Sequence, residues 1–274
     1  MKADLHNHSY FSDGFLSPRD LVRLASDVNC DLFALTDHDT TDGIVEAQLE
    51  ADKIGLNLLP GVEISAFWRN NAIHILGLGI NIDNDILQIG LEFNQNLRKD
   101  RAKKIALGLR RSGIKDGLDK AEKLSGGHML TRTHFAQMLI QEGYCKDMKS
   151  VFRRYMTGKK PGSVRVEWRN FDEVINWIQS AGGKALIAHP FRYRMTHTKI
   201  KNLIKDFKEA SGDGFEVVNA NSSKEEISLG SQWLEDHDLL ASCGSDFHGW
   251  PNQRVQIGNL IELPNSKRAV WTHM

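Results

Sequence analysis

Short apolar segments alternate with amphipathic segments over the first 84 residues. A helix is predicted to begin after Ser17, because Ser17 can cap the first turn, Pro18 suits the first helical position and Asp20 completes a capping box. A second helix is predicted over residues 43–54. Apolar runs that indicate buried strands lie at 3–5, 32–36, 58–59, 62–65 and 72–78. This alternation predicts parallel strands covered by helices.

The alternation stops after Ile80 and resumes beyond residue 162. Between these points the pattern is almost entirely helical, with helices predicted at 86–111, 118–124, 133–142 and 147–156. After it come predicted helices at 171–181, 199–209 and 223–236 and strands at 184–188, 215–218 and 240–242. The sequence therefore predicts an α/β domain formed by residues 1–84 and 165–274, interrupted by a small helical domain at 85–164.

Composition narrows the class of protein. The chain has 274 residues, of which 41% are hydrophobic, which is enough for a large core. No apolar run is long enough to cross a bilayer, and the first ten residues lack the apolar region of a secretory signal. The odd and widely spaced Cys30, Cys145 and Cys243 favour buried thiols in a reducing compartment. We therefore expect a cytoplasmic protein, and no obligate protein partner is indicated.

Charge is unevenly distributed, although the formal net charge is zero. Residues 85–164 contain 17 basic and 8 acidic residues, whereas the rest of the chain contains 18 basic and 27 acidic residues. An acidic body suits divalent cations, and a basic segment suits phosphate groups. Solvated helix faces would give the same composition, so charge alone leaves both interpretations open.

Histidines and carboxylates follow the predicted strands. In parallel α/β folds, functional groups gather at the carboxyl ends of strands. His6 and His8 are two residues apart, so both side chains face the same side of an extended segment. Imidazole and carboxylate are ligands for manganese, iron and zinc, and the absence of cysteine from this set argues against a structural thiolate zinc site. The set at or near strand ends comprises His6, His8, Asp13, His38, Glu63, His74, His189, Asp246 and His248.

A metal site explains this set better than nine separate structural roles. One histidine at a strand end is more often a hydrogen-bonded structural residue than a ligand. Burying six histidines with three carboxylates is costly, however, unless a cation compensates for them. Asp37 and Asp39 are either carboxylates that orient the imidazoles or ordinary loop and capping residues. His128, His197, His237 and His273 lie outside the set.

Several separated motifs make the chain resemble the PHP (polymerase and histidinol phosphatase) superfamily. They are D-L-H-N-H-S and S-D-G within 4–14, L-T-D-H-D-T at 35–40, G-V-E-I-S at 61–65, H-I-L-G at 74–77, A-H-P at 188–190 and G-S-D-F-H at 244–248. Within the basic segment, T-R-T-H-F-A at 131–136 and V-F-R-R-Y at 151–155 resemble the branch of 3′,5′-nucleotide bisphosphate phosphatases. Members of that branch are also described as 5′→3′ exoribonucleases acting on short RNA.

The resemblance implies a distorted (β/α)7 barrel with three divalent metal ions, commonly manganese, with iron or zinc as alternatives. One ion would be held by His6, His8, Glu63 and Asp246. The second would be held by Asp13, His38 and His248, and the third by Glu63, His74 and His189. Phe191 stands where we expect glycine in close relatives, and it could reshape one wall of the pocket.

The implied reaction is hydrolysis of the 3′-phosphate of nucleoside 3′,5′-bisphosphates, with short RNA as a further substrate. A hydroxide that bridges two ions, held by His6, His8, Asp13, Glu63 and Asp246, would attack phosphorus in line. Arginine side chains and the start of a helix suit the phosphate that is not cleaved. The predicted substrate-binding residues are Arg98, Arg101, Arg132, Thr133, His134 and Arg192.

Three other functions remain open from the sequence. A histidinol-phosphatase-like enzyme would cleave small phosphate monoesters, but it would not need so basic an insertion. A non-catalytic PHP module would bind a partner, but such a module would be expected to lack ligands, and here every ligand position matches. A protein that binds nucleic acid through the basic segment would need aromatic side chains for base stacking, and this segment has few of them.

Overall fold

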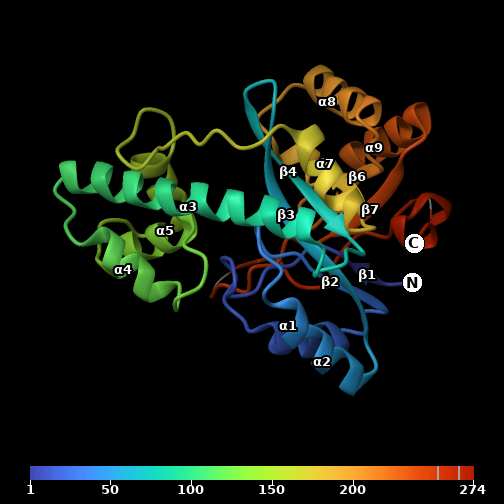
Figure 1. The fold of residues 1–274 in the computed structure, drawn as a ribbon, viewed down its shortest axis with the longest axis horizontal. Coiled ribbons are helices and arrows are strands. Elements are labelled where there is room, and N and C mark those ends of the chain that lie inside the picture. Colours follow the sequence, from blue (N-terminus) through green and yellow to red (C-terminus); the bar gives the residue numbers. More distant parts are fainter. Residues whose placement is uncertain (252, 265) are drawn as a thin grey trace.

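A nearly closed barrel forms the body of the protein (Figure 1). The computed structural model describes residues 1–251, 253–264 and 266–274. Within these ranges a seven-stranded sheet has the strand order β1 to β7, and the backbone N–H of Leu5 donates to the carbonyl of Cys243 at 3.0 Å, joining the two edges. The expected distorted (β/α)7 barrel is confirmed. Its strands are β1 (Ala3–Asp4), β2 (Leu32–Leu35), β3 (Asn57–Trp68), β4 (Asn71–Leu78), β5 (Lys184–Ile187), β6 (Gly214–Asn219) and β7 (Leu240–Gly244).

Strand β4 runs against its neighbours, so the prediction that all strands are parallel is wrong. It pairs antiparallel with β3 and with β5, whereas the remaining neighbouring pairs, β1–β2, β2–β3, β5–β6 and β6–β7, are parallel. Arg69 and Asn70 connect β3 to β4, and both have the positive φ angles, 44° and 63°, of a tight two-residue hairpin. The segments 58–59 and 62–65, predicted separately, are parts of the single strand β3, which continues through Pro60 and Gly61.

Helices cover the outside of the barrel. Ser17 caps α1 as expected, accepting a hydrogen bond from the backbone N–H of Asp20 at 3.0 Å. In Figure 1, α1 and α2 lie on one side and α7 to α9 on another. The covering helices are α1 (Pro18–Asp27), α2 (Ile44–Ile54), α7 (Phe171–Ser180), α8 (His197–Glu209) and α9 (Lys224–His237). Short 3₁₀ turns lie at Pro190–Arg192, Ser266–Arg268 and Val270–Thr272.

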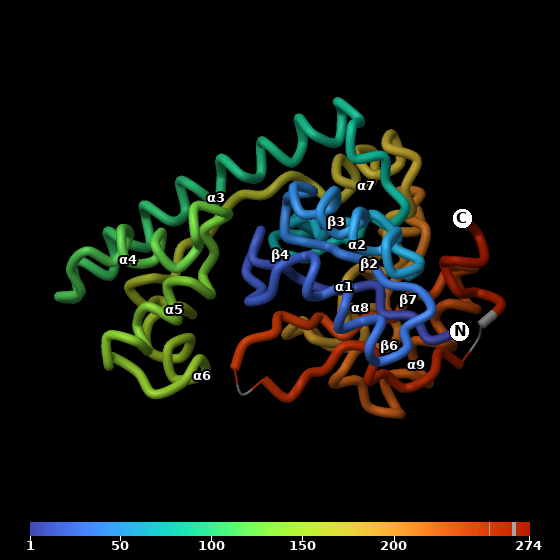
Figure 2. Tube along the Cα trace, turned by 90° about the horizontal axis from the view of Figure 1, so that it is seen from below, coloured from blue at the N-terminus to red at the C-terminus, as the bar shows by residue number. Residues whose placement is uncertain are grey.

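A second helical layer stands beside the barrel. Helix α3 (Asp85–Arg111) leaves the barrel, and α4 (Gly117–Leu124), α5 (Arg132–Gln141), α6 (Met148–Val151) and the π-helical turn Phe152–Met156 follow it (Figure 2). These helices have their own apolar core, which includes Ile105, Leu109, Phe135 and Leu139. In the part of the chain that the structure describes, no helix combines the length and the apolar character that crossing a membrane requires.

Candidate metal centre

The side chains predicted as ligands meet at one end of the barrel. The described residues contain three groups of His, Asp and Glu whose ligand atoms all lie within 4.8 Å of one another. All four residues predicted for the first ion lie in one group. The group that contains the residues predicted for the second ion also includes His8. In the third group, His38 stands in place of the predicted His189. The groups are His6, His8, Glu63 and Asp246; His8, Asp13, His38 and His248; and His38, Glu63 and His74.

Glu63 occupies the middle of this cluster. It lies on β3 and is fully buried, and its two oxygens face different histidines. Its Oε1 atom lies 2.8 Å from His74 Nδ1 and 3.0 Å from His189 Nε2, so His189 joins the cluster through Glu63. Its Oε2 atom lies 3.3 Å from the Nε2 atoms of His6 and His8 and 2.8 Å from His38 Nδ1.

Several atoms in the cluster lack hydrogen-bond partners, and this is the arrangement that a cation needs. Among the described residues, His6 Nε2, Asp13 Oδ1, His38 Nδ1 and Glu63 Oε2 are buried without a hydrogen bond, even though imidazole and carboxylate atoms are close by. Buried polar side-chain atoms normally have a partner. Lone pairs of nitrogen and oxygen that converge in this way fit manganese, iron or zinc. The residues present therefore suit divalent cations.

The pKa values of His8 and His248 are shifted in opposite directions. Burial and the nearby His248 and His38 lower the pKa of His8 to about 3. Burial also disfavours the charged form of His248, but Asp13 and Asp246 outweigh it and raise the pKa of His248 to about 9. The rings of His8 and His248 stack with centroids 4.3 Å apart. Metal ligands must release their protons to bind a cation, so cation binding at this cluster would release protons.

The interpretation that Asp37 and Asp39 orient imidazoles is wrong. Asp37 accepts hydrogen bonds from the backbone N–H of Ser9 at 2.8 Å and from the hydroxyl of Ser12 at 2.6 Å, so it shapes the loop after β1. Burial raises its pKa to about 6. Asp39 accepts from the backbone N–H of Ser65 at 2.9 Å and from Arg98 Nε at 2.6 Å, so it fastens α3 to the barrel.

Glu216 is the carboxylate that contacts the histidines from outside the cluster. It lies buried on β6, with Oε1 3.3 Å from His6 Nδ1, and its Oε2 atom accepts the backbone N–H of His189 at 2.6 Å. This residue is not among the predicted site residues. A signal was present, because Glu216 is a charged residue inside the apolar strand segment F-E-V-V.

Three of the four arginines predicted to bind substrate lie in the helical layer, and they have different surroundings. Arg98 is committed to the barrel, since it donates to Asp39 and, through Nη2, to Ser65 Oγ at 2.8 Å. Arg101 and Arg132 line one small pocket and have no carboxylate partner among the described residues. Burial, Arg132 and Arg98 lower the pKa of Arg101 to about 8, and burial and Arg98 also lower the pKa of Arg132. This pocket therefore holds two cationic side chains without a counterion.

The other predicted substrate-binding residues contact protein groups. Thr133 donates its hydroxyl hydrogen to Asp13 Oδ2 at 2.9 Å, and the Arg192 Nη1 atom donates to Asp246 Oδ2. His134 Nδ1 accepts the backbone N–H of Thr131 at 3.1 Å and so completes the capping box of α5.

Two contacts between aromatic rings involve Phe191 and His128. Phe191 stacks on Trp233 with ring centroids 5.5 Å apart, so its ring packs against α9. His128, which the sequence analysis placed outside the metal set, stacks on Tyr10 with ring centroids 4.9 Å apart.

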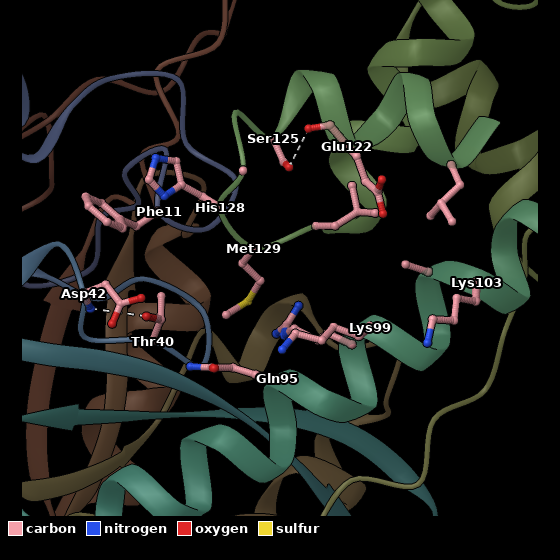
Figure 3. A pocket seen from close by; sticks show the side chains of 15 residues that line it. Phe11, Thr40, Asp42, Gln95, Lys99, Lys103, Glu122, Ser125, His128 and Met129 are labelled. Atoms are coloured by element: carbon pink, nitrogen blue, oxygen red, sulfur yellow. Dashed lines mark hydrogen bonds between the residues drawn. The ribbon is translucent and has the colours of Figure 1, made fainter. Parts of the chain in front are cut away.

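A cavity of about 600 Å³ lies between the barrel and the helical layer. Phe11 from the loop after β1, Gln95 and Lys99 from α3, and His128 and Met129 from the segment that joins α4 to α5 line it (Figure 3). The backbone N–H of Met129 donates to the carbonyl of Phe11 at 3.4 Å, so this segment touches the loop that carries Asp13.

Comparison with known proteins agrees with this geometry. Residues 4–237 match the model of the PHP domain family. The chain is 39% identical to a 3′,5′-nucleoside bisphosphate phosphatase of Chromobacterium violaceum, over 99% of this chain and 95% of that protein. It is also 39% identical to a 5′-3′ exoribonuclease of Haemophilus influenzae, over 98% of each. The solved structure of an amidohydrolase from C. violaceum, with bound sulfate and no metal, has a TM-score of 0.93 at 39% identity and covers 100% of this chain and 95% of that one. The chain therefore belongs to the PHP domain family.

Proposed function

We propose that this protein is a metal-dependent phosphoesterase that removes the 3′-phosphate of nucleoside 3′,5′-bisphosphates and releases nucleotides from the 5′ end of short RNA. One observation carries the proposal: the histidine–carboxylate cluster lies beside Arg101 and Arg132, two cations without a carboxylate partner among the described residues. Relatives named as a bisphosphate phosphatase and as exoribonucleases support it.

The proposed ligands form three sets, two of which share Glu63. They are His6, His8, Glu63 and Asp246; Asp13, His38 and His248; and Glu63, His74 and His189. We expect three divalent ions, with manganese ahead of iron and zinc. When bound, such cations neutralise phosphoryl oxygens and lower the pKa of water toward neutrality.

The chain's own side chains orient the ligands and the substrate. Arg192 holds Asp246 Oδ2, which leaves Oδ1 of Asp246 beside His6 and His8, at 3.5 and 3.1 Å from their Nε2 atoms. The side chain of Arg192 is 45% exposed, so it can also contact a phosphate oxygen of the substrate.

We assign the phosphate that is not cleaved to Arg101 and Arg132. Two partly buried guanidinium groups without a counterion are costly, and a phosphate dianion would pair with both. Arg132 precedes Thr133, which contacts Asp13, so this pocket lies beside the cluster. A substrate with two phosphates on one ribose needs two adjacent sites, one for the phosphate that is cleaved and one for the phosphate that is not. Arg98 is already paired with Asp39, so we exclude it from this role.

The three free, buried cysteines suit a reducing compartment, and we expect the protein to act in the cytoplasm. The proposed reaction involves only the metal cluster and the arginine pocket, so it requires no second protein.

The test has two parts. The first is metal analysis of the purified protein, followed by measurement of phosphate release from adenosine 3′,5′-bisphosphate with manganese added. The second compares this substrate with a simple phosphate monoester in the Arg101→Gln and Arg132→Gln variants. Arg110→Gln serves as the control, because Arg110 is exposed on the same helix as Arg101.

Loss of a charge-assisted contact should lower kcat/KM for the bisphosphate about 10- to 100-fold and leave the simple ester unchanged. Equal losses for both substrates, or no loss, would contradict the arginine assignment and favour a histidinol-phosphatase-like monoesterase. A protein that binds cations but hydrolyses neither ester would be a non-catalytic module.

A further inference from the structure

Glu216 connects two histidines that come from different strands. Its side chain is almost completely buried, at 1% exposure, on β6 between β5 and β7. Both oxygens lie near His6 Nδ1, Oε1 at 3.3 Å and Oε2 at 3.4 Å, and Oε2 also accepts the backbone N–H of His189. Gly244 on β7 lies against both, since a Cβ atom added there would come within 2.2 Å of His6 Cβ and 2.8 Å of Glu216 Oε1. The glutamate is therefore enclosed in a site with little spare room.

The contact with His6 determines which ring nitrogen carries hydrogen. A carboxylate has only acceptor atoms, so a hydrogen bond from His6 to Glu216 Oε1 requires hydrogen on Nδ1. The other ring nitrogen, Nε2, then has a free lone pair, and it lies 3.3 Å from Glu63 Oε2 and 3.5 Å from Asp246 Oδ1. This is the tautomer that can bind a cation through Nε2.

The contact with His189 holds a strained backbone. His189 has φ 32° and ψ 55°, in the left-handed region that residues other than glycine rarely adopt. Pro190 follows it, and the residue before a proline is normally extended. Hydrogen bonding of the His189 N–H to Glu216 Oε2 at 2.6 Å stabilises this conformation, in which His189 Nε2 lies 3.0 Å from Glu63 Oε1.

We propose that Glu216 is a positioning residue of the metal centre, which fixes the tautomer of His6 and the backbone conformation of His189 at once. The inference rests on the proposed function, since it assigns a role toward the cations of that same centre. The two oxygens serve two N–H donors, with Oε2 close to both, so replacing either oxygen by an NH₂ group disturbs at least one of these contacts.

Glu216→Gln makes that change. A glutamine offers one acceptor and an NH₂ group, so one of the two N–H donors loses its acceptor and faces hydrogens instead. If the NH₂ group faces His189, the strained backbone loses its support. If it faces His6, it favours the tautomer with hydrogen on Nε2, among Glu63 and Asp246. Either outcome weakens cation binding.

The experiment measures cation binding rather than turnover. Metal-free wild type, Glu216→Gln and Glu50→Gln are titrated with Mn²⁺, and metal bound per chain is determined by mass spectrometry. Glu50 is the matched control, a buried carboxylate on α2 that accepts from Arg23 Nε at 2.7 Å. Thermal unfolding of the metal-free proteins reports folding, and ¹⁵N NMR of the imidazoles reports the tautomer of His6.

Glu216→Gln should bind Mn²⁺ about 10- to 100-fold more weakly than wild type while Glu50→Gln binds normally. The His6 resonances should also move from the Nδ1–H toward the Nε2–H pattern or become heterogeneous. Binding as tight as that of wild type with an unchanged His6 tautomer would overturn the inference. So would equal weakening in Glu50→Gln, which would indicate a general loss of stability.

A second variant covers the case in which Glu216→Gln does not fold. Glu216→Asp keeps both acceptors but is one methylene shorter, so it should also bind Mn²⁺ more weakly, and wild-type affinity would overturn the inference. A wild-type protein that binds no cation would instead contradict the proposed function, so the two failures are distinguishable.

Discussion

Thr133 donates its hydroxyl hydrogen to Oδ2 of Asp13 across 2.9 Å, and this contact joins α5 to the loop that follows β1. The other carboxylate oxygen of Asp13 has no hydrogen bond among the described residues and lies 3.2 Å from His248 Nε2. The helical layer thus contacts a side chain of the histidine–carboxylate cluster, in addition to lining the pocket of Arg101 and Arg132.

Removing this hydroxyl should loosen the cluster. Thr133→Val keeps the shape of the side chain and deletes the donor, so Asp13 can rotate, and affinity for Mn²⁺ should fall about tenfold. Thr133→Ser should retain wild-type affinity because it keeps the hydroxyl. Thr157→Val is a control within the same layer, where the hydroxyl donates only to the carbonyl of Phe152. If Thr133→Val binds Mn²⁺ as tightly as Thr157→Val, the contact does not orient Asp13.

Arg98→Met should destabilise the protein strongly. Arg98 is only 8% exposed and pairs with the fully buried Asp39, and removing one partner of a buried ion pair leaves the other uncompensated. We expect the free energy of unfolding to fall by about 3–5 kcal/mol, measured by urea denaturation. If Arg98→Met lowers the free energy of unfolding by less than an exposed control such as Arg110→Met, the Arg98–Asp39 ion pair contributes little to stability.

Arg101→Met, three residues further along the same helix, should have the opposite effect. Arg101 has no carboxylate partner among the described residues, and its lowered pKa reflects burial beside Arg132 and Arg98. Removing an unsatisfied charge should raise the free energy of unfolding of the ligand-free protein by about 1–3 kcal/mol. Inorganic phosphate should then raise the Tm of wild type more than that of the variant. A variant that melts below wild type would contradict this account.

His248 should make the stability of the metal-free protein depend on pH. Its pKa is about 9 in the folded protein and 6.5 in the ordinary, unfolded environment. The raised folded pKa means that its stabilisation is complete below pH 6.5 and is lost as the pH rises through 9. Relative to His248→Gln, wild type should therefore lose on the order of 2 kcal/mol of stability between pH 6.5 and 9. Urea denaturation with a chelator present checks this, and a difference that is constant with pH would refute it.

Gly244→Ala should disturb the packing between β7 and the segment that follows β1. The new methyl group would meet His6 Cβ at 2.2 Å, far inside van der Waals contact, so β1 must shift. We expect a loss of about 1–3 kcal/mol in the free energy of unfolding, with weaker Mn²⁺ binding. Gly117→Ala is the control, because its methyl group would meet Met138 Cε at 3.4 Å and Leu109 Cδ1 at 3.9 Å, both ordinary van der Waals contacts. Equal stability of the two variants would show that β1 has room to move.

The sequence predicted the cluster better than its surroundings. His6, His8, Asp246 and His248 were selected because they follow strands, and such positions meet at one end of a barrel whatever the details of pairing. The direction of β4 was not predictable in this way, because most of its residues are buried and its nearly continuous apolar run resembles that of a parallel strand.

Contacts between distant segments were beyond sequence reasoning. The sequence leaves Asp37 and Asp39 as either orienting carboxylates or loop and capping residues, yet the carboxylate beside His6 is Glu216, 210 residues away in the chain. Arg98 and Arg101 have the same charge and share a helix, and only the position of Asp39, 59 residues before Arg98, distinguishes them. Such partners depend on the packing of β2, β3 and α3.

The backbone N–H of Asp246 donates to the carbonyl of His6 at 2.8 Å. This hydrogen bond closes the barrel between the first and the last segments that supply predicted ligands. A ribosome synthesises His6 and His8 240 residues before Asp246 and His248. Under the proposed function, the complete centre cannot form on the nascent chain until His248 has emerged. Metal loading is then a step that follows translation, and it draws on whichever cations the cell supplies to the finished protein.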